Sequence, residues 1–95
     1  MLVLPAELTH AQARAGLELL RRAAAAEPGP EVLVDATALA HFDSSALAVL
    51  LGLRRSCLQA GHTLAVRGLA SRLRTLAGLY GVSALLPEAP TAAKA

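Results

Sequence analysis

An acid and two hydroxyls, Asp43-Ser44-Ser45, stand directly before the uncharged apolar run ALAVLLGL, residues 46–53. Aspartate and serine commonly satisfy the free backbone N–H groups at the start of a helix. The same residue types can also do chemistry, because a serine hydroxyl can accept a phosphoryl group or act as a nucleophile. The apolar run must be buried, so the helix that it forms fixes where the two hydroxyls point.

These residues allow two interpretations. In the first, Asp43 is a helix N-cap and needs no function to explain it. In the second, the exposed hydroxyl of Ser44 belongs to a binding surface. A phosphate on Ser44 would meet the N–H groups of the helix but would be repelled by the Asp43 carboxylate, so this position could act as a charge switch.

A third possibility is a small hydrolase that uses Ser44 as its nucleophile. The sequence has no Gly-x-Ser-x-Gly turn, and a short chain leaves little volume for a substrate pocket. The histidines His10, His41 and His62 do not have the spacing of metal ligands, and no glycine-rich phosphate loop is present. We therefore expect no enzymatic activity, no catalytic residue, no metal and no cofactor.

Composition limits the remaining function classes. The 95 residues are 55% hydrophobic but only 2% aromatic, and the net charge is +2. One small domain with a core of Leu, Val and Ala is expected, and nucleic-acid binding is not, because aromatic and basic residues are too few. The single cysteine, Cys57, lies in an apolar segment and is expected in the core.

The sequence also predicts where the protein works. The longest uncharged run is too short to cross a bilayer, and no basic and apolar signal segment opens the chain. We expect a cytoplasmic protein that reaches a membrane, such as the inner membrane, only through a partner.

Hydrophobic patterning predicts a β-α-β-α-β-α order, and therefore an α/β fold with a mostly parallel sheet and helices packed on it. The predicted domain covers residues 1–87, followed by a flexible tail at 88–95. The predicted strands cover residues 2–4, 31–37 (the central strand), 63–67 and, as a last short strand, 82–87. The first predicted helix starts at the Thr9/Gln12 capping box and ends at EPGP (27–30). The second runs from Asp43 to about Ala60, and the third covers residues 70–81.

Two predicted helices carry apolar stripes at helical spacing. Ala13, Leu17, Leu20 and Ala24 form the buried stripe of the first helix. The corresponding stripe of the third helix is formed by Leu69, Leu73, Leu76 and Tyr80.

The segment VLVDATALAHFDSSALAVLL resembles the STAS domains, the fold of bacterial anti-sigma factor antagonists. Their hallmark is a strand that ends in Asp, a short loop, and Asp-Ser/Thr-x-Gly-Leu at the start of a helix. The resemblance makes Asp35 the strand-end acid, Asp43 the motif acid, Ser44 the residue phosphorylated in the antagonists and Leu47 the motif leucine. Ala46 stands where the family usually has Gly, a difference that narrows the room for a partner's backbone.

The segment LAVRGLASRLRTLAGLYGVSALLP is similar to the end of MlaB-type STAS proteins, in its Leu76-Ala77-Gly78-Leu79-Tyr80 helix and in Leu86-Pro87. This resemblance implies a non-enzymatic module that binds the ATPase subunit of an ABC transporter, which moves phospholipids between the membranes of Gram-negative bacteria. The alternative is an antagonist whose partner is an anti-sigma factor kinase and which leaves that partner when its motif serine is phosphorylated.

The expected partner contact is centred on Asp43, Ser44 and Ser45. Ala46 and Leu47 are expected to shape the adjoining surface, and Asp35 is expected to brace the loop before the helix.

Arginines form a second group of candidates. Arg67, Arg72 and Arg74 are expected near the start of the third helix, either as a solvated face or, with Tyr80, as the rim of an interface. Arg21-Arg22 and Arg54-Arg55 fall late in predicted helices, where they are either solvated helix ends or a phosphate-binding patch.

The N-terminal hairpin of STAS domains is shortened here to LVL at residues 2–4. Either the first strand is missing or the start codon lies inside the natural reading frame. The sheet edge that this leaves exposed predicts a tendency to form homodimers.

Overall fold

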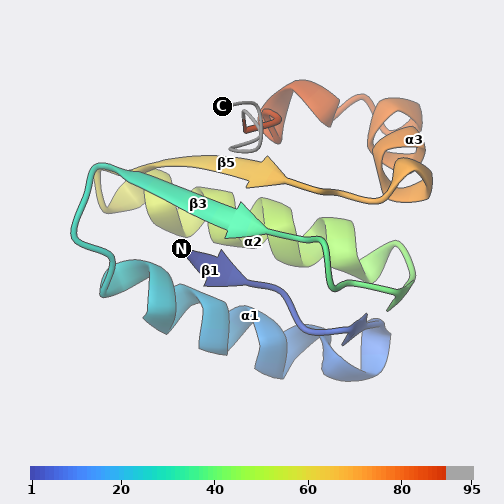
Figure 1. Cartoon of the computed structure of the whole chain (residues 1–95), viewed down its shortest axis with the longest axis horizontal. Coiled ribbons are helices and arrows are strands. Elements are labelled where there is room, and N and C mark those ends of the chain that lie inside the picture. The colour runs from blue at the N-terminus through green and yellow to red at the C-terminus, as the bar shows by residue number, and fades with distance from the viewer. Residues whose placement is uncertain (90–95) are drawn as a thin grey trace.

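The computed structural model describes residues 1–89 and confirms the predicted α/β fold class. Each of the three α-helices follows one or two strands along the chain (Figure 1). The elements are β1 (Leu2–Val3), β2 (Glu7–Leu8), α1 (His10–Ala25), β3 (Glu31–Asp35), β4 (His41–Phe42), α2 (Ser45–Gln59), β5 (Thr63–Arg67), α3 (Ser71–Leu79) and the 3-10 helix η1 (Ser83–Leu85).

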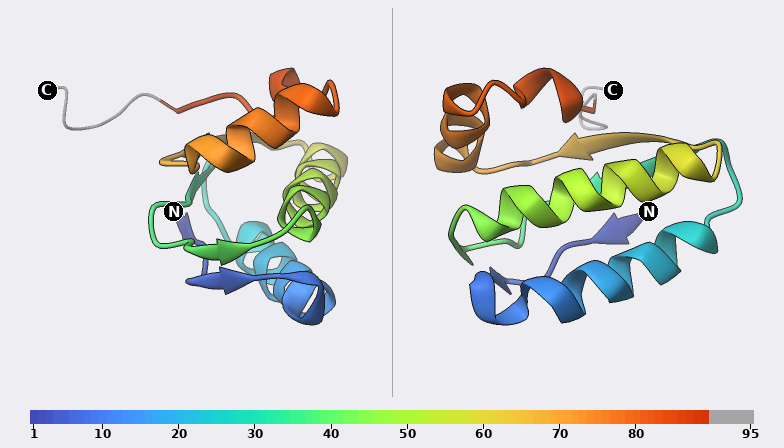
Figure 2. Two further views of the ribbon diagram at one scale, coloured as in Figure 1. Left: turned by 90° about the vertical axis from the view of Figure 1, so that its right-hand side faces the viewer. Right: turned by 180° about the vertical axis from the view of Figure 1, so that it is seen from behind.

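The main sheet has three parallel strands in the order β1-β3-β5. The predicted central position of β3 is therefore confirmed. In register, Val3 of β1 lies opposite Asp35 of β3, and Asp35 lies opposite Arg67 of β5. Helices α1 and α2 lie side by side across one face of this sheet (Figure 2).

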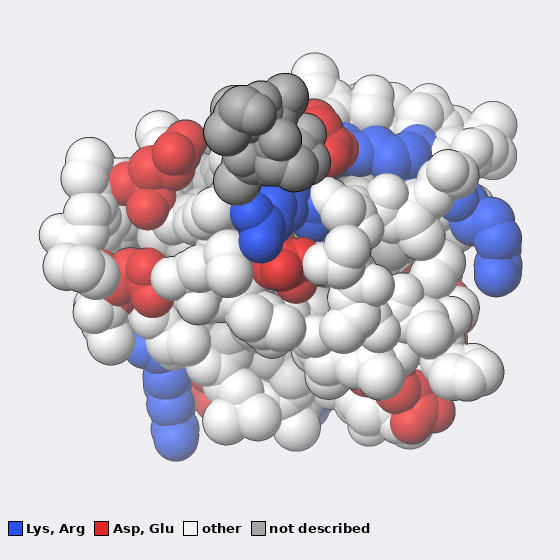
Figure 3. Space-filling view, viewed as in Figure 1, with Lys and Arg blue, Asp and Glu red and all other residues white. Residues whose placement is uncertain are grey.

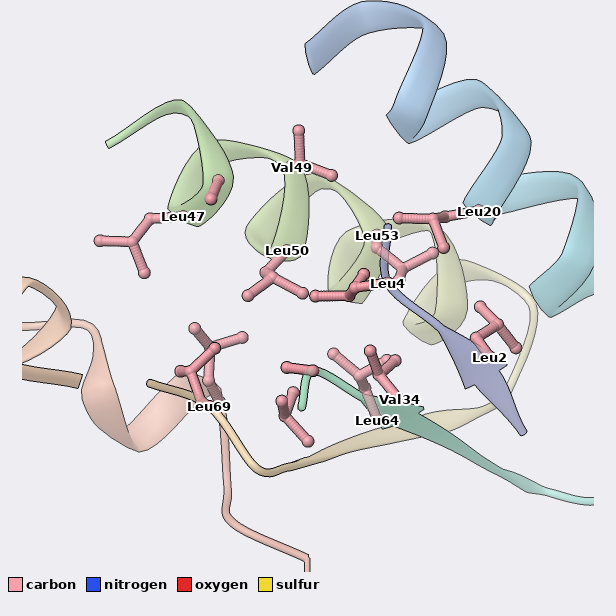
Figure 4. Close-up of a cluster of buried hydrophobic side chains, with 14 of the residues drawn as sticks. Leu2, Leu4, Leu20, Val34, Leu47, Val49, Leu50, Leu53, Leu64 and Leu69 are labelled. Atoms are coloured by element: carbon pink, nitrogen blue, oxygen red, sulfur yellow. The ribbon is translucent and has the colours of Figure 1, made fainter. Parts of the chain in front are cut away.

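The core fills the space between the sheet and these two helices. Val34 and Leu64 on the strands face Leu50 and Leu53 on α2 (Figure 4). All four side chains are buried, as expected where a parallel strand is covered by helices. The predicted stripe of α1 is also confirmed. Its four residues, Ala13, Leu17, Leu20 and Ala24, all pack in or against this core.

A second, two-stranded sheet was not predicted from the sequence. β2 pairs in parallel with β4, with Glu7 opposite His41 and Leu8 opposite Phe42. Each strand has two residues, too few for a period-two pattern to be recognised. This pairing joins the segment before α1 to the segment before α2.

The predicted last strand at 82–87 is wrong. Residues 83–85 form η1, and the chain turns back to the sheet only afterwards. The backbone N–H of Val66 donates to the Pro87 carbonyl (2.9 Å), and the N–H of Ala89 donates to the Val66 carbonyl (2.8 Å). Periodicity does not distinguish a strand from a helical turn in an apolar run of this length.

Two residues beyond the predicted end of the domain at residue 87 also contact it. Ala89 is buried, and the carboxylate of Glu88 forms an ion pair with Arg74 (2.6 Å). Residues 88 and 89 are therefore packed against the domain, while the rest of the predicted tail lies outside the described residues.

Candidate functional site

The N-termini of α1, α2 and α3 lie near the same edge of the molecule. Because β1, β3 and β5 are parallel and each precedes a helix, α1, α2 and α3 all begin beyond the carboxyl ends of the strands (Figure 1). This is the edge at which open α/β folds usually meet ligands and partners. We call it the carboxyl edge.

Asp43 holds the start of α2 and the start of α1 together. The backbone N–H of Ser45 donates to Asp43 Oδ1 (2.8 Å), and the backbone N–H of His10 donates to Asp43 Oδ2 (3.1 Å). The Ser45 bond, followed by the His10 bond, lowers the pKa of the Asp43 carboxyl below its ordinary value. Asp43 is therefore a capping residue, although it stands one position before the N-cap residue, Ser44.

Ser44 lies at the surface with its hydroxyl free of the capping role. It occupies the N-cap position of α2, with φ −63° and ψ −15°, and its side chain makes no cap hydrogen bond. Asp43 already satisfies the first N–H group of the helix, so the hydroxyl of Ser44 is not needed there. Ser45 is half-buried in the first turn. This arrangement leaves Ser44 accessible to another molecule.

Ala46 and Leu47 do not form part of that surface, which corrects the expectation from the sequence. Their exposed fractions are 0% and 3%, because the first turn of α2 directs both side chains into the core. The methyl group of Ala46 consequently takes no room from a partner's backbone. The accessible part of the motif ends at Ser45.

Asp35 lies at the end of β3 and binds the loop that follows. Its carboxylate accepts hydrogen bonds from the hydroxyl and the backbone N–H of Thr37 and forms an ion pair with Arg67 (3.3 Å). The Thr37 hydroxyl, then the Thr37 N–H and then Arg67 lower the pKa of Asp35. The Asp-x-Thr spacing is a local turn signal that could have identified Thr37 from the sequence.

The three arginines expected to cluster near α3 make separate contacts. Arg67 turns to Asp35, while Arg74 donates to the Leu86 carbonyl (2.6 Å) and pairs with Glu88. Only Arg72 reaches the segment before α2, where its guanidinium lies 5.1 Å from the centre of the Phe42 ring. Since Phe42 directly precedes Asp43, Arg72 contacts the residue next to the motif.

Tyr80 does not belong to the core stripe of α3. It ends the helix as its C-cap residue and is 61% exposed, and its neighbour Leu79 is 76% exposed. Leu73 and Ala77 supply the buried face of this helix instead. An exposed tyrosine beside an exposed leucine is available to an interface.

The site offers hydrogen-bonding groups and apolar surface. Over residues 1–89, no group of three His, Cys, Asp or Glu side chains is arranged to hold a metal ion. None of the helices in that range combines the length and the apolar character needed to cross a membrane. Figure 3 shows acidic and basic side chains scattered among uncharged ones on the described part of the sheet face.

Comparison with known proteins agrees with this architecture. A family model described as "Mlab, STAS domain" matches residues 1–87, which is nearly the whole chain. No curated protein matches the chain. STAS domains are in general non-catalytic modules that bind partner proteins. The extent of the family match, together with the parallel sheet and the motif at the start of α2, shows that the chain belongs to the STAS domain family of MlaB type.

Proposed function

We propose that this protein binds and supports the ATPase subunit of an ABC transporter that moves phospholipids between membranes. The observation that carries the proposal is the exposed hydroxyl of Ser44 on a rigid support. Asp43 fixes this first turn to α1, and the buried face of α2 anchors the helix behind it. A rigid polar surface of this kind favours association because little freedom is lost on binding.

The chain itself acts without catalysis in this proposal, and ATP is hydrolysed by the partner. A nucleophilic serine would need a base within hydrogen-bond reach. The carboxylate nearest to Ser44 in sequence, Asp43, is already bonded to two backbone N–H groups. The protein works in the cytoplasm and reaches the inner membrane through the transporter.

The contact is centred on Asp43, Ser44 and Ser45. Arg72, which contacts the Phe42 ring, and the exposed Tyr80 would form its rim, where charged and aromatic side chains set orientation and association rate. Arg74 contributes to the partner contact only indirectly, because its guanidinium holds the C-terminal segment, Leu86 to Glu88, beside α3.

The test uses the tagged protein to purify the ATPase from its own cells. The Ser44→Ala variant is expected to weaken capture of the ATPase modestly. Ser44→Glu is expected to abolish it, because the new charge would be desolvated in the interface and would repel Asp43. Thr63→Glu is the matched control, since Thr63 is exposed at the opposite end of β5.

The outcomes separate the parts of the proposal. Retention of the ATPase by Ser44→Glu would remove Ser44 from the contact. Failure of the wild-type protein to retain any ABC ATPase would overturn the proposed partner.

A second candidate is an anti-sigma factor antagonist, which the exposure of Ser44 also favours. Its partner would be a kinase that phosphorylates Ser44. Mass spectrometry of the protein isolated from its own cells distinguishes the two functions. Stoichiometric phosphate on Ser44 favours the antagonist, and unmodified Ser44 in complex with an ABC ATPase favours the transporter.

Self-association through β1 is a separate part of the proposal. Within residues 1–89, β1 has a strand neighbour on one side only, and Val3 is exposed. An unpaired edge of this kind can join a second copy. Light scattering during size-exclusion chromatography should detect a dimer at high concentration, and a purely monomeric elution would contradict it.

A further inference from the structure

The outer surface of α2 is hollowed along its C-terminal half, far from Ser44. A groove of about 450 Å³ lies between α2 and η1. We call this hollow the α2 groove. Its lining residues are Leu51, Arg54, Arg55, Leu58, Gln59 and Leu85.

The α2 groove continues toward α1. A second hollow of about 240 Å³ shares Arg55 and Gln59 with it and extends to Leu17 and Arg21. The two hollows therefore adjoin on the solvent side of α2, with Arg55 and Gln59 lining both. The α2 groove is lined by residues spread from Leu51 to Gln59 of α2, which suits a rod-shaped segment better than a compact ligand.

The floor of the groove includes exposed apolar surface. Leu58 is 47% exposed and Leu85 is 36% exposed, and they lie on the two elements that border the groove. Leu51 and Leu58 are seven positions apart on α2, which corresponds to about 10 Å along the helix axis. A helix laid in the groove could place apolar side chains two turns apart against these residues.

All charged residues that line the two hollows are positively charged. Arg21, Arg54 and Arg55 line the two hollows, and none of the lining residues is acidic. Arg21 is paired with Glu18 (3.4 Å), but no ion pair or side-chain hydrogen bond occupies Arg54 or Arg55 among the described residues. Two guanidinium groups beside apolar surface are complementary to carboxylates beside apolar side chains.

We propose that the α2 groove binds an acidic amphipathic helix of a partner protein. The apolar side chains of the partner helix would cover Leu58 and Leu85. The carboxylates of the partner helix would pair with Arg54 and Arg55. A concave groove favours a helix over an anionic membrane, because a flat bilayer surface cannot enter a hollow between two elements. Leu58 lies thirteen residues beyond the first residue of α2, about 20 Å along its axis. The groove is thus a second surface, independent of Ser44.

The probe is a synthetic fourteen-residue helix with leucines on one face and glutamates on both sides of that face. Two-dimensional NMR of the isotope-labelled protein should show shifts confined to the groove residues. Affinity should fall as salt is added, because ion pairs at the surface are screened. A matched peptide with lysine in place of glutamate should not bind.

Charge reversal supplies the control. Arg54→Glu with Arg55→Glu should weaken peptide binding at least tenfold, while Arg14→Glu, on an exposed position of α1, should leave it unchanged. Equal binding of the lysine peptide, or shifts located at Ser44, would overturn the proposal. Vesicles of phosphatidylglycerol that shift the groove residues when the acidic peptide does not would overturn it in favour of a membrane surface.

Discussion

The Asp43 carboxylate accepts the backbone N–H of His10, a residue 33 positions earlier in the chain. The other oxygen of the same carboxylate accepts the N–H of Ser45. One side chain therefore stabilises the first turns of both α1 and α2. The parallel pairing of β2 with β4 supports this junction, because it brings the segments before the two helices together.

Replacement of Asp43 by alanine should lower the melting temperature, since two helix-start N–H groups lose their acceptor. Asp43→Asn should fall between the wild type and Asp43→Ala, because the amide oxygen can still accept a hydrogen bond but carries no charge. Thermal unfolding followed by circular dichroism measures both. Equal melting temperatures for Asp43→Ala and the wild type would show that the junction does not contribute to stability.

The contribution of Asp43 should also depend on pH. Its folded-state pKa is lowered from 3.8, so the folded state favours the ionised carboxylate. The stability that the charge provides is fully present above about pH 5 and is lost as the pH falls through the lowered pKa of the folded state. Urea unfolding of wild type and Asp43→Asn at a series of pH values should therefore give curves that differ at neutral pH and converge in acid.

Gly68 is expected to resist substitution. Its φ is +72°, and a Cβ at this position would lie 2.8 Å from the Thr37 Cγ2 atom. The left-handed backbone alone costs an alanine about 1–2 kcal/mol, and displacement of Thr37 adds to this cost. Urea unfolding of Gly68→Ala should show the loss.

A double variant separates the two reasons why Gly68→Ala should lose stability, which are the left-handed backbone and the displacement of Thr37. Thr37→Ser removes the Cγ2 atom but keeps the hydroxyl that binds Asp35. In the Thr37→Ser background, Gly68→Ala should be less destabilising than in the wild type. An identical loss in both backgrounds would assign the whole effect to the backbone conformation.

Arg74 should hold the C-terminal segment, residues 86–89, against the domain. Arg74→Met removes the donor to the Leu86 carbonyl and the ion pair with Glu88. Loss of a partner for a part-buried carbonyl costs about 1–3 kcal/mol. Hydrogen exchange of the Ala89 amide, which donates to Val66, should accelerate in this variant. Arg72→Met, which removes an arginine from the same helix, should leave that amide protected.

Cys57 should be unreactive in the folded protein. Its side chain is 2% exposed, and burial raises the pKa of the thiol above 9.0. Modification by a thiol reagent such as Ellman's reagent should therefore be slow at pH 8 and should become rapid in urea. Fast modification without denaturant would show that the C-terminal half of α2 opens readily.

Much of the fold followed from local patterns in the sequence. The five-residue strand TLAVR has the bounds of β5, and the central position of β3 agrees with its continuous apolar run. Helix α1 begins directly after Thr9, where the Gln12 side chain accepts the backbone N–H of Thr9 (2.8 Å). These features depend on hydrogen bonds and burial patterns within a single segment, so the sequence determines them.

The tertiary structure decided which residues of the motif are accessible. The sequence could place Asp43, Ser44 and Ala46 at the start of a helix, but the rotation of that helix against the sheet exposes Ser44 and buries Ala46. It also decided that Asp43 binds His10, because this contact requires two distant segments to be paired first. The α2 groove likewise needs η1 in place beside α2. Local propensity sets the elements, whereas exposure and long-range bonds depend on how those elements pack.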